Sequence, residues 1–228
     1  MKNSAGFCAA QIILFGLFLL LVAPFASAQI ADADVPHEIQ FAGVPLDTAV
    51  QNLARITGWN FFIDPQLTTG VDGQPKLLPA LDIHWTNTTA AAAIMRVAQE
   101  NHLVLATNAA TGVLRIVGEK RIFHPVNPAL LGAGTNSVIP MIRFADVPLG
   151  DALKFFINAA HLPVTLDPRV TGDAPPQPPD FKTPFQPQVS LSWQNLTARQ
   201  AIVELCEEYD LILVKGETAG STVIQPGK

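Results

Sequence analysis

The chain repeats itself at the scale of a whole domain, and this repetition limits its fold more than any other feature. When the sequence is shifted against itself by 103 residues, FAGVPLDTA from Phe41 lies over FADVPLGDA from Phe144. Without a gap, the same shift brings Asp64-Pro65 onto Asp167-Pro168, and eight of the 25 positions in this window are identical. A constant offset over such a window indicates that one folding unit occurs twice.

Beyond the Asp-Pro pair the offset grows to 108, so that Trp85 matches Trp193 and Thr89 matches Thr197. The change of five residues indicates an insertion in the second copy. Between the copies, prolines and glycines are typical of a linker long enough to let the two modules move, and this pattern leaves open whether they pack together. The expected organisation is a first module, a linker and a second module, at residues 36–118, 119–136 and 137–226.

Each copy predicts the element order β-α-β-β-α-β-β. The first helix begins at a Pro-Leu pair, with the proline in its first turn, and carries an apolar stripe at i, i+3, i+4 and i+7. The two stripes are Leu46, Ala49, Val50, Leu53 and Leu149, Ala152, Leu153, Phe156. The second helix begins at Thr89 or Thr197, and Thr197 with Gln200 fits a capping box. The expected class is α+β, with helices packed on short mixed sheets.

A strand of alternating apolar residues precedes each second helix and ends near Trp85 or Trp193. Both tryptophans share the parity of the inward residues, which favours a place in the core over a role as exposed anchors for a partner. The residues that define the repeat are Pro45, Leu46, Asp64, Pro65 and Trp85, with their counterparts Pro148, Leu149, Asp167, Pro168 and Trp193.

The first 28 residues have the pattern of a secretory signal peptide. Lys2 is followed by an apolar run over residues 12–25 and by small residues that end at Ala28, which predicts cleavage before Gln29. A retained membrane anchor is the alternative, although the apolar run is shorter than the roughly 20 residues that cross a bilayer. Cys8 precedes the apolar core, where a lipid-attachment cysteine does not occur.

Charge and cysteine content exclude several classes of function. Without the leader the chain has 13 basic and 19 acidic residues, a balance that argues against nucleic acid or an anionic membrane surface as a partner. Only Cys206 remains, so no intramolecular disulfide is expected. Its acidic neighbours in a helical pattern disfavour a nucleophilic thiolate.

No constellation in the sequence indicates catalysis, a metal or a cofactor. The five histidines are scattered, and no Gly-rich phosphate loop or Gly-x-Ser-x-Gly elbow is present. Asp64 and Asp167 precede prolines, where aspartate is ordinary turn chemistry. We therefore expect a protein that is not an enzyme. Only a pocket that joined Asp64, His84 and a third polar group would favour one.

The second copy carries a Pro-rich loop at residues 170–188, typical of extended polyproline II structure. Its candidate partner-binding residues are Phe181, Phe185, Pro175 and Pro176, since a stiff segment loses little entropy on docking. A passive surface loop is the equal alternative. Asn87 and Asn195 match a glycosylation acceptor, but their place at a helix start favours capping.

The order of strand, Val-Pro-Leu, amphipathic helix, strand ending in Asp-Pro, alternating strand, helix and hairpin resembles the short N-terminal (STN) domain of secretins and TonB-dependent receptors. The resemblance covers nearly all of the chain after the leader, once per copy. It implies a periplasmic, non-catalytic module that acts by contact, within a ring of a secretion or pilus system or in receptor signalling at the outer membrane.

Several expectations about partners follow. They are other envelope proteins, such as secretin, pilus, secretion or TonB-system components, or further copies of the chain, with membrane association only through such a partner. No stretch of barrel strands precedes the end at Lys228, so the chain is not expected to build a pore alone. The alternative function is a small-ligand or glycan-binding module with a pocket lined by Trp59, Phe61 or loop aromatics.

Overall fold

The computed structural model describes residues 35–69, 76–173, 187–218 and 220–227, and the fold is α+β, as predicted. The predicted signal peptide lies outside the described residues. So do the candidate partner-binding residues of the Pro-rich loop, Pro175, Pro176, Phe181 and Phe185. No helix among the described residues is long and apolar enough to span a membrane.

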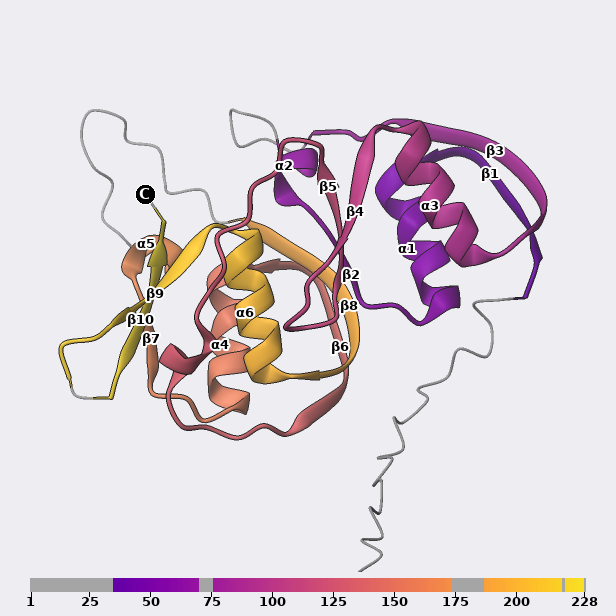
Figure 1. The fold of residues 1–228 in the computed structure, drawn as a ribbon. Coiled ribbons are helices and arrows are strands. Elements are labelled where there is room, and N and C mark those ends of the chain that lie inside the picture. The colour runs from indigo at the N-terminus through magenta and orange to yellow at the C-terminus, as the bar shows by residue number, and fades with distance from the viewer. Residues whose placement is uncertain (1–34, 70–75, 174–186, 219, 228) are drawn as a thin grey trace, which may run out of the picture.

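Residues 37–118, the first half, contain two sheets and two main helices (Figure 1). The elements are β1 (His37–Pro45), α1 (Leu46–Thr57), β2 (Phe61–Ile63), α2 (Pro65–Thr68), β3 (Ala80–Thr88), α3 (Ala90–Glu100), β4 (Leu103–Thr107) and β5 (Leu114–Gly118). Strands β1 and β3 form an antiparallel pair. The other sheet has the order β2-β5-β4, in which β2 runs parallel to β5 and β4 runs antiparallel to it.

Residues 138–226, the second half, repeat this order and pairing. The elements are β6 (Val138–Pro148), α4 (Leu149–Ala159), β7 (Val164–Leu166), α5 (Pro168–Thr171), β8 (Gln188–Thr197), α6 (Ala198–Glu208), β9 (Leu211–Lys215) and β10 (Thr222–Pro226). Strands β6 and β8 pair antiparallel, and the second sheet has the order β7-β10-β9.

The predicted apolar stripes of α1 and α4 are buried in the two cores, as are Trp85 and Trp193. Pro45 and Pro148 stand one position before the expected place, at the N-cap rather than in the first turn. The capping box of Thr197 and Gln200 is confirmed at the start of α6. Cys206 is fully buried in α6, and burial raises the pKa of its thiol, so it is a packing residue.

The sequence did not predict the short helices α2 and α5, which begin at the Asp-Pro pairs. The Asp64 side chain accepts a hydrogen bond from the Gln66 backbone N–H at 2.9 Å, and Asp167 accepts one from Arg169 at 2.8 Å. Proline at the first helical position leaves no N–H without a partner there. Both aspartates therefore act as N-caps, in agreement with the predicted turn chemistry.

The prediction that Asn87 and Asn195 cap the second helices was wrong. Thr89 and Thr197 are the N-caps, and each accepts a hydrogen bond from the backbone N–H three residues on. The two asparagines have φ of 53° and 54°, within or at the end of β3 and β8. Asparagine tolerates the left-handed region better than most residues, which explains its recurrence at this bend.

The segment predicted to be a linker, for which the sequence left packing open, is packed against the second half. It contains a short 3₁₀ helix, η1 (Pro128–Leu131), whose Leu131 is buried in the second core together with Val126. The Thr222 hydroxyl donates a hydrogen bond to the Leu130 carbonyl, and Arg199 donates to the Gly132 carbonyl at 2.7 Å. The two buried apolar residues are too widely spaced among prolines and glycines to produce a periodic pattern.

Candidate functional site

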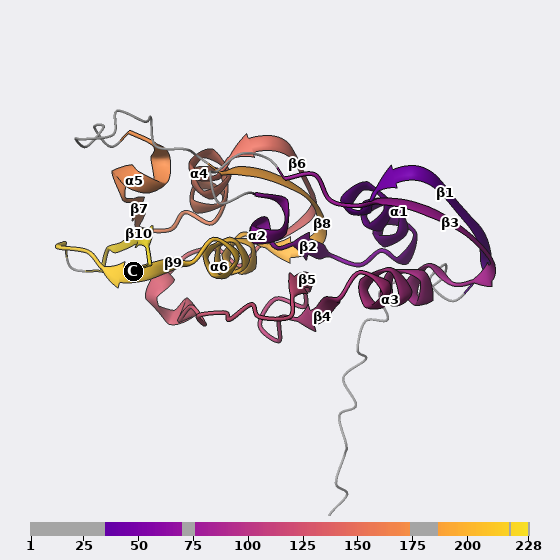
Figure 2. The same cartoon turned by 90° about the horizontal axis from the view of Figure 1, so that it is seen from above.

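The contact between the two halves is the most elaborate polar arrangement among the described residues, and it is built on the β2-β5-β4 sheet. In both views this sheet lies between helices α1 and α3 and the second half (Figures 1 and 2). Side chains alternate across it: Phe61 and Ile116 join the first core, whereas Phe62 packs in the second core. Arg115 stands beside Phe62 in the parallel register and shares its face.

Strand β8 holds the free edge of β2 through three hydrogen bonds. The Asn60 side chain donates to the Gln194 carbonyl at 2.7 Å and accepts from the Gln194 backbone N–H at 2.6 Å. The Trp193 indole N–H donates to the Phe61 carbonyl at 2.9 Å. These bonds fix the position of β2 on the second half, since the Asn60 side chain pairs with both the backbone N–H and the backbone carbonyl of Gln194.

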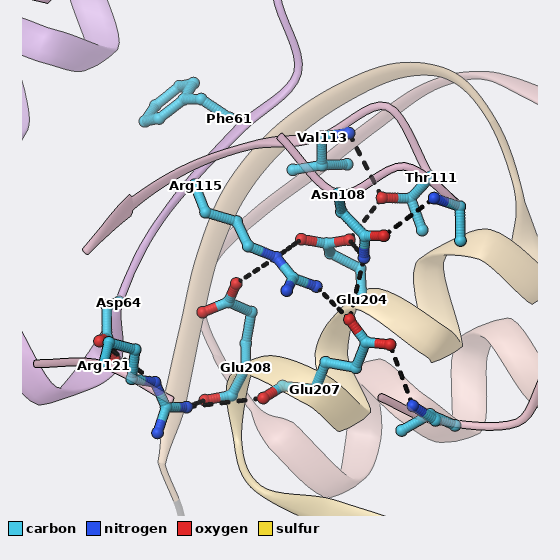
Figure 3. A network of polar contacts seen from close by, with 12 residues as sticks. Phe61, Asp64, Asn108, Thr111, Val113, Arg115, Arg121, Glu204, Glu207 and Glu208 are labelled. Carbon is cyan, nitrogen blue, oxygen red and sulfur yellow. Dashed lines mark hydrogen bonds and ion pairs between the residues drawn. The ribbon is translucent and has the colours of Figure 1, made fainter. Parts of the chain in front are cut away.

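Arg115 is the centre of a buried ion cluster with three glutamates of α6 (Figure 3). Its Nε lies 2.6 Å from Glu204 Oε1, and its Nη2 lies 2.7 Å from Glu207 Oε2. Nε also lies 2.7 Å from Glu208 Oε1. Arg115 is 4% exposed and Glu204 is 0% exposed, so the pairs are shielded from water. The spacing of the glutamates at i, i+3 and i+4 places all three on one face of α6.

Polar groups of the first half and of the segment that follows it donate hydrogen bonds to two of these glutamates. The Thr111 hydroxyl donates to Glu204 Oε2 at 2.5 Å, and the Asn108 amide donates to Glu204 at 2.8 Å and to Glu207 at 3.0 Å. The Val126 backbone N–H donates to Glu207 Oε1 at 3.0 Å. Charge-assisted bonds of this kind offset the cost of removing the carboxylates from water.

A second arginine, Arg121, extends the cluster toward the ends of β2 and α6. Its guanidinium lies 2.9 Å from an Asp210 oxygen and 3.3 Å from Asp64 Oδ2, and it donates to the Glu208 carbonyl at 2.8 Å. Arg121 and Arg115 both lie against the ring of Phe123, at 5.1 and 4.4 Å from its centroid. The segment after β5 is therefore held to the C-terminal end of α6.

The protonation of Glu208 is perturbed by its burial more than by the excess of carboxyl groups over arginines in the cluster. Burial raises its pKa to about 8, an effect that Arg115 opposes and that the neighbouring Glu204 reinforces. Although Arg115 Nε lies 2.7 Å from Glu208 Oε1, its N–H donates to Glu204, and neither oxygen of Glu208 accepts a hydrogen bond within the described part of the chain. Burial also raises the pKa of Asp64, against the effects of the Gln66 N–H and Arg121.

A cleft of about 560 Å³ opens between the halves, on the side of the N-terminus of α1. Its walls include the aromatic residues Phe61, Phe62 and Tyr209 and polar groups of both halves. The polar lining residues include Asp47, Thr48, Gln51, Asp146 and Ser190. Phe61 and Phe62 expose only 7% and 4% of their surface, so they offer little ring face to a ligand.

Asp64 and His84, the two residues from which a catalytic pocket could have been built, do not come together. His84 is exposed and lies 2.7 Å from Glu38, whereas Asp64 is buried beside Arg121. The Asp64, His84 and third-group arrangement that would have favoured an enzyme is therefore not formed. Trp59 does not line the cleft. Among the described residues, no group of three or more His, Cys, Asp or Glu side chains is placed to hold a metal ion.

The residues of the ion cluster were not predicted from the sequence, although two signals were present. Arg115 interrupts an apolar strand at a position where the second copy has Val223, and the three glutamates share one helix face.

Comparison of the chain with protein-family models, curated proteins and solved structures found no match to any of them.

Proposed function

We propose that the chain is a non-catalytic, exported protein that acts by contact with other proteins. It would serve as an interaction or assembly component of a secretin-like secretion or pilus system, or of a TonB-receptor-like signalling system. The observation that carries the proposal is the docking of one half on the other. The outer face of the β2-β5-β4 sheet receives α6 and β8 of a second unit with the same element order.

A fold unit whose sheet face and edge bind another such unit has the surfaces that an assembly protein needs. The Asn60 side chain completes the backbone hydrogen bonds of Gln194, and Phe62 fills the neighbouring core. This contact combines a buried apolar centre with paired polar groups, as specific protein interfaces do.

The ionisable groups that lie close together favour a structural role over catalysis. Arg115, Glu204 and Glu208 are nearly inaccessible to solvent, and Arg115 contacts both glutamates. A substrate would have to separate the two halves to reach them. The proposal therefore includes no catalytic residue and no cofactor.

The N-terminal leader pattern and the resemblance to secretin and TonB-receptor domains support a periplasmic location, with outer-membrane association through a partner. Expression of the full chain followed by mass spectrometry of the exported fraction tests this part. We expect a mature N-terminus at Gln29. An intact leader in a membrane fraction would instead support the retained anchor.

Photocrosslinking in cells of the source organism tests the interaction function. A photoreactive phenylalanine analogue replaces Val214, which lies half-buried on the outer face of the second sheet. We expect a discrete crosslinked species at this position and none at Val138, an exposed control on β6. Equal or absent crosslinking at both positions would contradict an interaction role for this face.

A parallel experiment tests the Pro-rich loop. Deletion of residues 173–188 should reduce capture of the crosslinked partner if this loop contributes to docking. Unchanged capture would assign the loop a passive role and leave the rest of the proposal in place.

The cleft between the halves favours a second candidate function, binding of a small ligand or glycan. Its polar lining from both halves could recognise hydroxyl groups, and its volume suits a small molecule. The weak exposure of Phe61 and Phe62 argues against the ring stacking that sugars usually use. A thermal-shift screen with an oligosaccharide panel tests this function, and an absence of stabilisation would count against it.

A further inference from the structure

The two halves share one fold unit but expose different surfaces of it. The difference arises because the contact between the halves buries one helix face of the second half and one sheet face of the first. On α6, four positions are buried toward the first half: Val203, Glu204, Glu207 and Glu208. The equivalent positions on α3, which we call the α3 face, are all exposed: Met95, Arg96, Gln99 and Glu100. The helix face that receives a sheet in the second half is therefore open in the first half.

The sheets show the complementary difference. Phe62, Arg115 and Val117 are buried on the outer face of the first sheet. Their counterparts are the exposed Thr165 and the half-buried Val223 and Gln225. We define the outer sheet face of the second half by the residues Thr165, Ile212, Val214, Val223 and Gln225.

From this arrangement we infer that a second copy of the chain docks its α3 face on the outer sheet face of the first copy. The contact would repeat, between molecules, the contact that joins the two halves within one molecule. This inference rests on the proposed function and names the chain itself as the partner. It joins two different surfaces, so it is heterologous and can continue from copy to copy.

The charges of the two surfaces are compatible with this contact. Arg96 and Glu100 on the α3 face pair with each other at 2.8 Å, so the face carries no unpaired charge from them. The outer sheet face is uncharged. Val223 stands at the position equivalent to Arg115, the arginine of the first half that pairs with three glutamates of α6. Docking would therefore bury the aliphatic side chains of the sheet face together with the Arg96–Glu100 pair. It would leave no isolated charge, although removing the pair from water has a cost that weakens the contact.

One hydrogen bond of the internal contact can also be repeated. Trp193 donates its indole N–H to the Phe61 carbonyl across the halves. Its counterpart Trp85 donates no hydrogen bond within the described residues, and the counterpart of Phe61 is Val164 at the start of β7. Arg96 lies over the Trp85 ring at 4.3 Å and would have to turn aside, which its exposed side chain permits.

Two features predict that the contact between copies is weaker than the contact within the chain. Pro163 is the residue of the second half equivalent to Asn60. Because proline has no side-chain amide, the two hydrogen bonds that Asn60 makes with Gln194 have no counterpart between copies. The buried ion cluster is also missing. Association should therefore be reversible and depend on concentration.

Cysteine crosslinking between differently labelled copies tests the inference. The full chain is purified in a Cys8→Ser background, with any leader processing retained, and Cys206 is kept because it is fully buried. Copies with Met95→Cys are mixed with copies carrying Val214→Cys and treated with a short bis-maleimide. We expect a crosslinked dimer in the mixture and none in either preparation alone. Val138→Cys mixed with Met95→Cys is the control, because Val138 is exposed but lies on neither surface.

Each other outcome would overturn the inference. Crosslinking of Val214→Cys copies with themselves would show a symmetric contact between two sheets, and equal yield with the Val138→Cys control would show random collision. No crosslink, with sedimentation as a monomer at about 100 μM, would exclude a contact of useful strength. As a second variant, Ile212→Arg introduced into the Val214→Cys copies should lower the yield at least about tenfold, since it buries a charge against α3.

The inference and the proposed function can fail separately. If the photoreactive group at Val214 captures a different protein and never a second copy, the interaction function stands and the self-association is wrong. If it captures neither, both are wrong.

Discussion

Arg115 Nε lies 2.6 Å from Glu204 Oε1, although the two residues belong to opposite halves of the chain and are 89 positions apart. Both side chains are almost fully buried. An ion pair in such a place stabilises the structure only while all its partners are present, because each charge has lost its hydration. The pair therefore couples the stability of the two halves.

Replacement of Arg115 by methionine should destabilise the chain strongly. The change keeps most of the side-chain length but leaves the carboxyl groups of Glu204, Glu207 and Glu208 without their shared cation. Loss of one partner from a buried ion pair costs about 3 to 5 kcal/mol. Urea denaturation at pH 7 measures this loss. Arg96→Met is the matched control, because its pair with Glu100 is exposed and should contribute less than about 1 kcal/mol. Similar losses in the two variants would contradict a special role for the cluster.

The raised pKa of Glu208 predicts an unusual dependence of stability on pH. The folded chain keeps a proton on this carboxyl up to a pH of about 8, whereas an ordinary glutamate loses it near 4.5. Between these values the folded state binds more protons than the unfolded state, so stability falls as pH rises, by up to about 1.4 kcal/mol per pH unit. The contribution of Glu208 is complete below pH 4.5 and is lost as the pH passes 8.

Glu208→Gln removes this titration and should flatten the fall in stability between pH 5 and pH 8. Urea denaturation at several pH values in this window measures the slope. The control is Glu100→Gln, which changes an exposed carboxyl at the equivalent position of α3. An unchanged slope in Glu208→Gln would show that this carboxyl is ionised in the folded chain at neutral pH.

The repeat made the secondary structure of this chain unusually easy to predict. Each apolar stripe, capping threonine and Asp-Pro pair occurs twice, so agreement between the copies filters out accidental patterns. The fold depends on these local signals, and the stripes of α1 and α4 are buried as expected. The short helices after Asp64 and Asp167 escaped prediction, because four residues are too few to show a helical period.

The polar site could not be predicted in the same way, because its residues interact across the chain. Arg115 and Glu204 have counterparts of different chemistry, Val223 and Arg96, so the repeat gave no support for their role. Their contact depends on how the halves pack, which no local pattern specifies. The sequence carries only two signals of this contact, an arginine in an apolar strand and glutamates on one helix face.

The hydrogen bond from Trp193 to the Phe61 carbonyl predicts different effects for one substitution at two equivalent sites. Trp193→Phe leaves this carbonyl without its donor, and an unsatisfied buried polar group costs about 1 to 3 kcal/mol. Trp85→Phe makes the same change in volume but removes no hydrogen bond among the described residues. Thermal or urea denaturation should therefore show a larger loss for Trp193→Phe, and equal losses would contradict a role of the indole N–H at the contact.

The packed segment between the halves makes a last prediction at Gly134. A Cβ at this position would lie 2.6 Å from the Ala160 carbonyl oxygen and would also meet the Leu162 side chain, so Gly134→Ala must displace the segment or the end of α4. Overpacking of this kind costs about 1 to 3 kcal/mol. Gly118→Ala is the control, because a Cβ there meets only Leu67 at an ordinary 3.7 Å. If urea denaturation finds both variants unchanged, the segment yields easily and behaves as a linker that lets the two halves move. A loss in Gly134→Ala alone would show that close packing, rather than chain connectivity, holds the segment against the second half.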